Sequence, residues 1–259
     1  MIEEPYRWVE AIANRREYIE HQLAGGSPIA ALSYKGGILL FTLGRERQKL
    51  YEIYDRIGLG TIGHPGDIER LRMTAIEITS TEGFARSAQD VSLRRLANYS
   101  LSPALKAAFE QVYGAPYLAR MLFAELGHNG APNTFLRLDY DGSIHTNGGA
   151  FGRAFEEFGV VSGTAASTAR MEQFLRKEKL PAATLEKAFQ IALDAWAIGH
   201  LALTAEPADD LPSDEDVAKH RSEQLAGASV EAAILTDNGT AATWRTLRDT
   251  EIRPQLEKR

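Results

Sequence analysis

Residues 29–42, IAALSYKGGILLFT, contain two short apolar runs joined by a turn signal. The runs are Ile29 to Leu32 and Ile38 to Thr42, and Gly36 and Gly37 end the polar segment between them. Glycine supplies the backbone geometry of a tight turn, and short apolar runs on both sides of such a turn are typical of paired strands. This stretch therefore predicts a β-hairpin.

Helical periodicity flanks the hairpin on both sides. Before it, apolar residues recur at helical spacing from Val9 to Leu23, and Gly25-Gly26 is a typical helix stop. After it, a second strand pair is expected at Lys49 to Tyr54 and Ile57 to Ile62. The helical period then returns from His64 to Thr81, so helices are expected to bracket the strands.

The rest of the chain continues in blocks of strands and helices. A second helix is expected from Ser87, and Pro103 inside it should kink or split it. Glu206 to Asp216 is dense in Asp, Glu and Pro and predicts an exposed acidic loop. The remaining predicted elements are strands at Leu118 to Leu126, Thr134 to Leu138 and Ser143 to Thr146, helices at Thr164 to Arg176 and Thr184 to Leu203, and a hairpin formed by Val230 to Leu235 and Ala241 to Arg245.

This order is neither a regular βαβ repeat nor an all-β pattern. Two antiparallel sheets packed face to face, with helix pairs on their outer faces, would bury the apolar side of every amphipathic element. The sequence thus predicts an α+β fold, a four-layer αββα sandwich. With 259 residues, 44% of them apolar, the chain is expected to form a single domain over residues 1–259.

The composition argues against several classes of function. The chain has 29 basic and 35 acidic residues, so it has no electrostatic reason to bind nucleic acid or an anionic membrane. It has no cysteine, which removes thiolate nucleophiles and cysteine-ligated metals. Its six histidines show no HxH or HExxH spacing, so neither a metal nor a cofactor is expected. The lack of cysteine, of an export signal and of a long apolar segment predicts a cytoplasmic protein.

Five segments in register along the chain resemble the α subunit of the bacterial, actinobacterial-type proteasome, a member of the N-terminal-nucleophile hydrolase fold. They are Gln48 to Ile57 (QKLYEIYDRI), Asp90 to Asn98 (DVSLRRLAN), Pro116-Tyr117 leading to Ala124-Glu125-Leu126, Leu138 to Ile144 (LDYDGSI) and Val230 to Leu235 (VEAAIL). The match covers nearly the whole chain, and it departs at Pro103, at residues 206–216 and from Asn147 to Phe158.

The resemblance implies a structural role for the N-terminal residues. Subunits of the α type carry a helical extension ahead of the first strand, which here falls at residues 9–24. The segment before it, residues 1–8, is expected to form a gate, with Tyr6, Arg7 and Trp8 at an axial pore. The resemblance implies a non-catalytic subunit of a homo-heptameric outer ring that controls substrate entry, templates assembly of the β ring and docks a regulatory AAA+ ATPase or another ring activator.

The resemblance also indicates where catalysis would reside. In active β-type subunits, Thr, Ser or Cys becomes N-terminal, and its α-amine acts as the general base. Here that position falls at Ser27, which is internal and followed by Pro28, while the supporting acidic position falls at Leu43, which cannot ionise. No catalytic residue is therefore expected, and a separate threonine-type β subunit would cut peptides.

Lys49 is the main site prediction. The resemblance implies that a lysine here, in a pocket between neighbouring α subunits, pairs with the C-terminal carboxylate of an activator. An ammonium forms a charge-assisted hydrogen bond with such a carboxylate, which an internal peptide segment lacks. Gly26 is expected to flank this pocket and permit close backbone approach. His64 is also expected to flank the pocket, at the start of a helix whose free amides favour an anion.

Two alternatives stay open at the level of the sequence. Cleavage after Gly26 would expose Ser27, with Lys49 nearby, and would make the chain a self-processed β-like peptidase. A proteasome-like ring built from this chain alone, as a scaffold, is the second alternative. The mass of the intact chain tests the first, and co-purification of a β-type chain tests the second.

Overall fold

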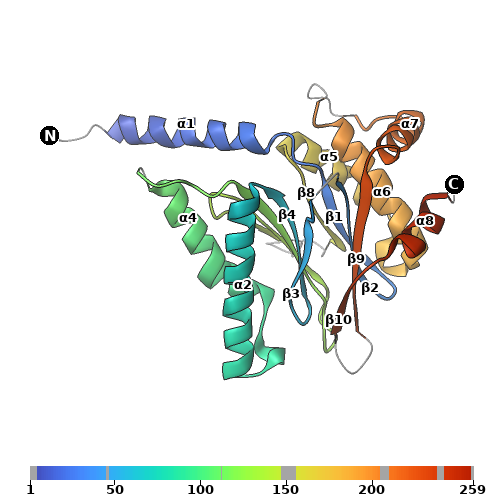
Figure 1. Ribbon diagram of the computed structural model, residues 1–259, viewed down its shortest axis with the longest axis horizontal. Coiled ribbons are helices and arrows are strands. Elements are labelled where there is room, and N and C mark those ends of the chain that lie inside the picture. Colours follow the sequence, from blue (N-terminus) through green and yellow to red (C-terminus); the bar gives the residue numbers. More distant parts are fainter. Residues whose placement is uncertain are drawn as a thin grey trace.

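The computed structural model describes residues 5–44, 47–111, 113–146, 156–204, 210–237 and 242–257. Two five-stranded sheets lie face to face at its centre, and helices cover the outer face of each sheet (Figure 1). Every strand pair described is antiparallel. The predicted four-layer α+β sandwich is therefore confirmed.

The first sheet contains the predicted hairpin and has the strand order β10-β9-β2-β1-β8. In the hairpin, Tyr34 pairs with Gly37, whose φ of +141° lies in a region that glycine tolerates. The edge strand β8 was not predicted, and it pairs through Phe158 with Leu32 of β1. The strands are β1 (Ile29–Tyr34), β2 (Gly37–Gly44), β8 (Phe158–Val161), β9 (Ser229–Asp237) and β10 (Ala242–Thr246).

The second sheet has the order β3-β4-β5-β6-β7, so its strands follow one another in space as they do in the sequence. Such a meander needs only short connections between neighbouring strands. Its one long connection, between β4 and β5, contains the helices that cover the sheet. The strands are β3 (Leu50–Tyr54), β4 (Ile57–Gly63), β5 (Ala119–Glu125), β6 (Thr134–Leu138) and β7 (Ile144–Thr146).

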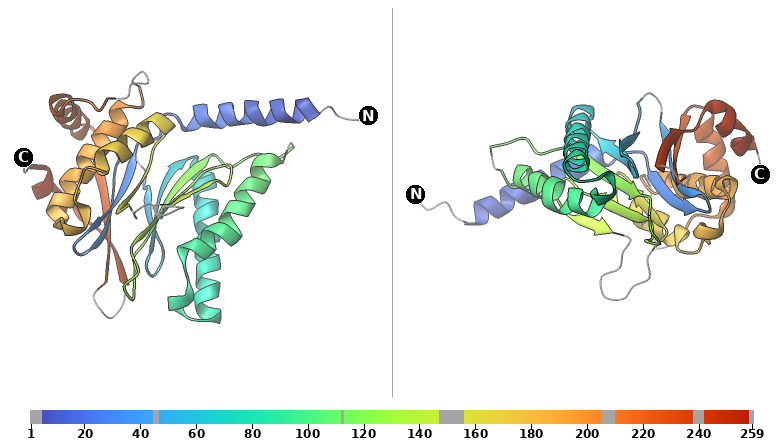
Figure 2. Two further views of the ribbon diagram at one scale, coloured as in Figure 1. Left: turned by 180° about the vertical axis from the view of Figure 1, so that it is seen from behind. Right: turned by 90° about the horizontal axis from the view of Figure 1, so that it is seen from below.

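The helices form the two outer layers. Those covering the second sheet are α2 (Pro65–Ala85), α3 (Leu93–Leu96) and α4 (Ser102–Glu110). Those covering the first sheet are α5 (Ala165–Leu175) and α6 (Leu185–Leu201), with α7 (Asp214–Leu225) and α8 (Asp249–Glu257) packed on α6. The N-terminal helix, α1 (Pro5–Leu23), extends along one edge and beyond the sandwich (Figure 2). No helix in the described residues is long and apolar enough to cross a membrane.

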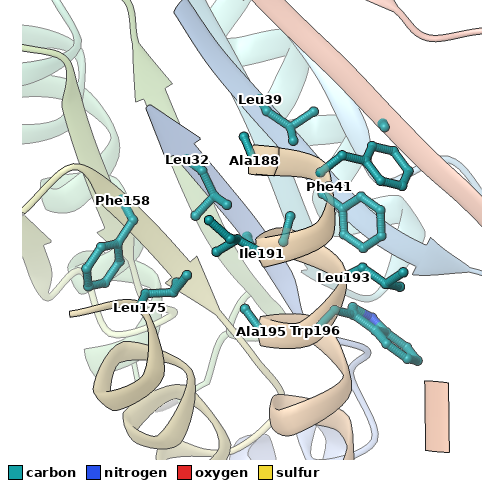
Figure 3. Close-up of a cluster of buried hydrophobic side chains, with 14 of the residues drawn as sticks. Leu32, Leu39, Phe41, Phe158, Leu175, Ala188, Ile191, Leu193, Ala195 and Trp196 are labelled. Carbon is teal, nitrogen blue, oxygen red and sulfur yellow. The ribbon is translucent and has the colours of Figure 1, made fainter. Parts of the chain in front are cut away.

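Three apolar clusters hold these layers together. One lies between the first sheet and α5 and α6 (Figure 3). In it, Phe41 meets Phe189 edge to face, with 5.1 Å between the ring centroids. A second fills the space between the sheets and includes Ile19 and Leu23 of α1. The third lies under α2, α3 and α4. Ile19 and Leu23 therefore anchor the C-terminal end of α1 in the core of the fold.

The N-terminal helix begins earlier than predicted. It starts at Pro5 instead of Val9, so Tyr6, Arg7 and Trp8 lie within its first two turns and do not precede it. Proline is favoured in the first helical turn, because its missing N–H has no partner there in any case. Residues 1–4 of the predicted gate segment fall outside the described residues.

The predicted acidic loop at residues 206–216 is wrong for its last three residues. Asp214, Glu215 and Asp216 form the first turn of α7, and the Ser213 hydroxyl accepts a hydrogen bond from the Asp216 N–H at 3.2 Å. Acidic side chains in a first turn are stabilised by the helix dipole, and serine is a preferred cap. The acidic run is therefore a helix start, while residues 205–209 lie outside the description.

The second predicted helix is split, as the proline indicated. A five-residue π-helical turn, Ala97–Leu101, separates α3 from α4, and Pro103 is the second residue of α4. A proline inside a regular helix clashes with the carbonyl four residues before it, and a wider turn relieves that clash. Pro103 thus lies in the first turn of α4, directly after the turn that separates α4 from α3.

Candidate functional site

A pocket of about 1010 Å³ opens where β2 and β4 end and where β1 and α2 begin. Gly26, Lys49 and Ile62 line it from the strand ends, and Trp196 and His200 line it from α6. The fold therefore brings two of the predicted site residues, Gly26 and Lys49, into one pocket.

Lys49 lies half-buried in the wall of the pocket. Next to it, the Glu231 carboxylate accepts the backbone N–H groups of Lys49 and Leu50, each at 2.9 Å. Burial lowers the pKa of Lys49 to about 8, and the Glu231 charge only partly offsets this. Burial also raises the pKa of Glu231. Within the described residues, the Lys49 ammonium has no ion-pair partner, so it is available to an incoming anion.

Gly26 permits a close approach between parts of this chain. A Cβ atom at Gly26 would lie 2.1 Å from the Ile62 Cγ2 atom. The Gly26 N–H donates to the Leu23 carbonyl at 2.8 Å, and its carbonyl accepts the Gly163 N–H at 3.0 Å. Gly26 thus joins the end of α1, the end of β4 and the loop before α5 at the edge of the pocket.

His64 is the N-cap of α2, in the position that the sequence predicted. Its side chain does not line the pocket, but its neighbours Gly63 and Pro65 do. The His64 Nδ1 atom accepts the Gly66 N–H at 3.2 Å, so one of the free helical amides is already occupied by the imidazole. His64 therefore shapes this edge of the pocket by capping the helix.

Comparison with known proteins identifies the fold. A family model described as proteasome subunit matches residues 24–201. The chain belongs to the proteasome subunit family. It is 30% identical over 257 residues to proteasome subunit alpha of Mycobacterium marinum, covering 96% of this chain and 85% of the relative. The corresponding protein of Mycobacterium leprae is 31% identical over 240 residues, with 91% and 80% covered. That of Mycobacterium tuberculosis is 29% identical over 251 residues, with 95% and 90% covered.

These relatives make the chain a non-catalytic, α-type proteasome subunit of the 20S core. Membership of the family implies assembly into rings with β-type subunits. The fold, the resemblance seen in the sequence and the family comparison therefore agree.

The Ser27 hydroxyl of this proteasome subunit has a structural role. It donates to the Leu43 carbonyl at 2.7 Å and accepts the Trp196 indole N–H at 3.1 Å. These bonds tie the start of β1 to the end of β2 and to α6. The backbone nitrogen of Ser27 is bonded to Gly26, so the α-amine that a nucleophile of this fold needs is not formed in the intact chain.

Two aromatic side chains of α6 that line the pocket, Trp196 and His200, were not predicted as site residues. Trp196 stacks on His200 at 4.7 Å between ring centroids, and the His200 Nδ1 atom lies 2.9 Å from the His220 Nε2 atom in α7. The spacing of Trp196 and His200 places both on one helical face, which indicated a shared neighbour. No sequence signal linked that face to Lys49, because the link depends on how α6 packs on β1 and β2.

The helix that bears the predicted gate residues is fastened to the sandwich in part by a charge cluster around the buried Arg120. Arg120 of β5 contacts Glu20 of α1 at 2.6 Å and Asp139 at 2.7 Å, and it donates to the Gly163 carbonyl at 2.6 Å. The Tyr140 hydroxyl also donates to Glu20, at 2.7 Å. Arg120 lies in β5 and Tyr140 in the turn after β6, so these residues help to set the direction of α1.

The described residues contain no group of three or more His, Cys, Asp or Glu side chains placed to hold a metal ion.

Proposed function

We propose that this subunit forms the homo-heptameric outer ring of a cytoplasmic 20S particle and that the pocket around Lys49 docks the C-terminal tail of a ring activator such as an AAA+ ATPase. One observation carries the docking proposal. A half-buried lysine, with no ion-pair partner in the described residues, lies in the wall of a pocket of about 1010 Å³. A pocket of that size holds several residues of a peptide.

The charges around the pocket favour a terminal carboxylate. Lys49 and Arg47 both line it, and they supply two positive charges. The acidic residue of the lining, Glu69, is held by Arg72, with contacts of 2.7 and 2.9 Å. Because Arg72 neutralises Glu69, the negative side chain offers little repulsion to an incoming carboxylate. The site is suited to the end of a chain, which has that charge, and not to an internal segment.

The position of α1 supports the gating part of the proposal. Ile19 and Leu23 near its C-terminal end are buried in the core, whereas Trp8 and Val9 near its other end are exposed. A helix fastened at one end can hold residues 5–8 at a fixed place in a ring. We infer that Tyr6, Arg7 and Trp8 face the entrance through which substrates pass.

The docking proposal is tested with the assembled particle and a labelled synthetic peptide that ends in the tail sequence of a proteasomal AAA+ ATPase. Lys49→Ala is expected to weaken binding of this peptide about tenfold or more, because a hydrogen bond to a charged group contributes about 1.5–3 kcal/mol. Fluorescence anisotropy measures the affinity.

Two controls separate docking from a loss of structure. Lys35→Ala removes an exposed lysine outside the pocket and should leave the affinity unchanged. A peptide amidated at its C-terminus should bind weakly to the unaltered particle and equally weakly to the Lys49→Ala variant. Unchanged binding of the acid peptide by Lys49→Ala would exclude Lys49 as the docking residue.

A further inference from the structure

Lys49 differs from the other lysines of the described chain in its surroundings. It alone among them is half-buried. The others are exposed: Lys35, Lys106, Lys177, Lys179, Lys187 and Lys219. Lys49 also lies in a pocket large enough to admit a second molecule beside it.

Among the described residues, the neighbours of Lys49 leave its amine without a strong partner. Both oxygens of Glu231 accept backbone N–H groups, one from Lys49 itself and one from Leu50. The Glu69 carboxylate is held by Arg72. A lysine that is desolvated and not ion-paired loses its proton more readily, and the neutral amine is the nucleophilic form.

We propose that Lys49 is an acylation site, at which the Nζ atom accepts an acyl group from an acyl phosphate that enters the pocket. Loss of the positive charge on Lys49 then weakens the binding of carboxylates in the pocket. This second consequence rests on the proposed docking function, whereas the acylation itself does not.

The step balances without any further reactant. The lone pair of the neutral Nζ atom attacks the acyl carbon, and a C–N bond forms. The bond between that carbon and the phosphate oxygen breaks, and inorganic phosphate leaves with the electron pair. The amine proton is released to solvent or to the phosphate. The product is an uncharged amide that can no longer pair with a carboxylate.

The pocket suits an anionic donor. Arg47 lines it with an exposed side chain, so a guanidinium is available for the phosphate group. The pKa of Lys49, about 8, means that about a quarter of its amines are neutral at pH 7.5. An ordinary lysine, with a pKa of about 10.4, has roughly one neutral amine in a thousand at that pH. Even if a less basic amine is a weaker nucleophile, Lys49 is expected to react about tenfold faster.

The test is incubation of the full-length subunit with acetyl phosphate at several pH values, followed by peptide mass spectrometry of each lysine. At pH 7.5, Lys49 is expected to become acetylated about tenfold faster than Lys35, Lys106 or Lys187. Its rate should level off above about pH 8, while the rates at the exposed lysines continue to rise with pH. Acetylation of Lys49 no faster than that of Lys35, or without this plateau, would overturn the proposal.

Tail binding is measured separately. Acetylated subunits should bind the acid tail peptide about as weakly as Lys49→Gln does. Lys49→Arg keeps the charge but cannot be acetylated under these conditions, so its binding should be unaffected by acetyl phosphate. If Lys49 is selectively acetylated and tail binding stays unchanged, the acylation site stands and the docking function falls. If tail binding needs Lys49 but the residue is not selectively acetylated, docking stands and the acylation site falls.

Discussion

At the scale of single residues, the chemistry of the pocket depends on the titration of Lys49. Its pKa of about 8 means that the ammonium is present below pH 8 and is lost above it. Binding of a carboxylate favours the ammonium and therefore requires uptake of a proton above pH 8. The affinity for an acid tail peptide is thus expected to fall by up to about tenfold per pH unit between pH 8 and 10.

The variant Lys49→Arg provides the control for this pH dependence, because a guanidinium keeps its charge throughout that range. Anisotropy titrations of both proteins at pH 7, 8, 9 and 10 would measure it. A profile of the unaltered subunit as flat as that of Lys49→Arg would show that Lys49 does not bear the binding charge.

At the scale of elements, one buried arginine contributes to the attachment of α1. Arg120 holds Glu20 and Asp139 together, and its own side chain is almost wholly buried. Without Arg120, Glu20 keeps the Tyr140 hydroxyl, and Asp139 keeps a longer contact to Arg137 at 3.9 Å. Because both carboxylates keep a partner and Glu20 is partly exposed, Arg120→Ala is expected to lower the free energy of unfolding by about 1–3 kcal/mol and to expose α1 to proteolysis.

Arg253→Ala is the matched control for this prediction, because Arg253 is an exposed arginine of α8. Urea unfolding and limited trypsin digestion would be followed for both variants. A change for Arg120→Ala no larger than that for Arg253→Ala would mean that other contacts, such as those of Ile19 and Leu23, hold α1 in place.

The contact between α6 and α7 is expected to weaken in acid. His220 of α7 lies against His200 of α6, and burial lowers the pKa of His220, although Glu223 acts in the opposite direction. As the pH falls through about 6.5, the unfolded chain binds a proton that the folded chain resists. The free energy of unfolding should therefore be smaller at pH 5.5 than at pH 7.5.

His220→Gln should remove part of this acid sensitivity, because glutamine cannot be protonated in this range. His21→Gln, a change at an exposed histidine of α1, should not. Thermal unfolding at the two pH values measures both. An equal pH dependence in His220→Gln and the unaltered chain would assign the effect to other groups.

At the scale of the whole molecule, the family membership predicts a mixed particle of full-length subunits. Co-expression with a β-type subunit from the same genome, followed by native mass spectrometry, should give a large complex in which this chain keeps its mass of 28.5 kDa. The hydrogen bonds of Ser27 to Leu43 and Trp196 support this outcome. A chain that begins at Ser27 would show self-processing and make it a peptidase subunit, and a large ring without any β-type chain would favour a scaffold.

The sequence by itself determined the layers of the sandwich and the family. Strands and helices were predictable at β1 and β2 or at α5 and α6, because a face buried against a sheet imposes a local period on the apolar residues. Family motifs around Lys49 likewise marked it as a site residue. The prediction was wrong where one local pattern is typical of two structures. The acidic run at Asp214 is such a case, because it fits both a solvated loop and the start of a capped helix.

Only the tertiary structure decided what surrounds Lys49. Glu231, whose carboxylate binds the backbone N–H of Lys49, comes 182 residues later in the chain. Trp196 and His200 reach the same pocket from α6. This helix packs on the outer face of the first sheet, which is turned away from the second sheet. Such neighbours leave no pattern in the sequence around Lys49, because they are brought there by the packing of distant elements. The same holds for the burial that lowers the pKa of Lys49.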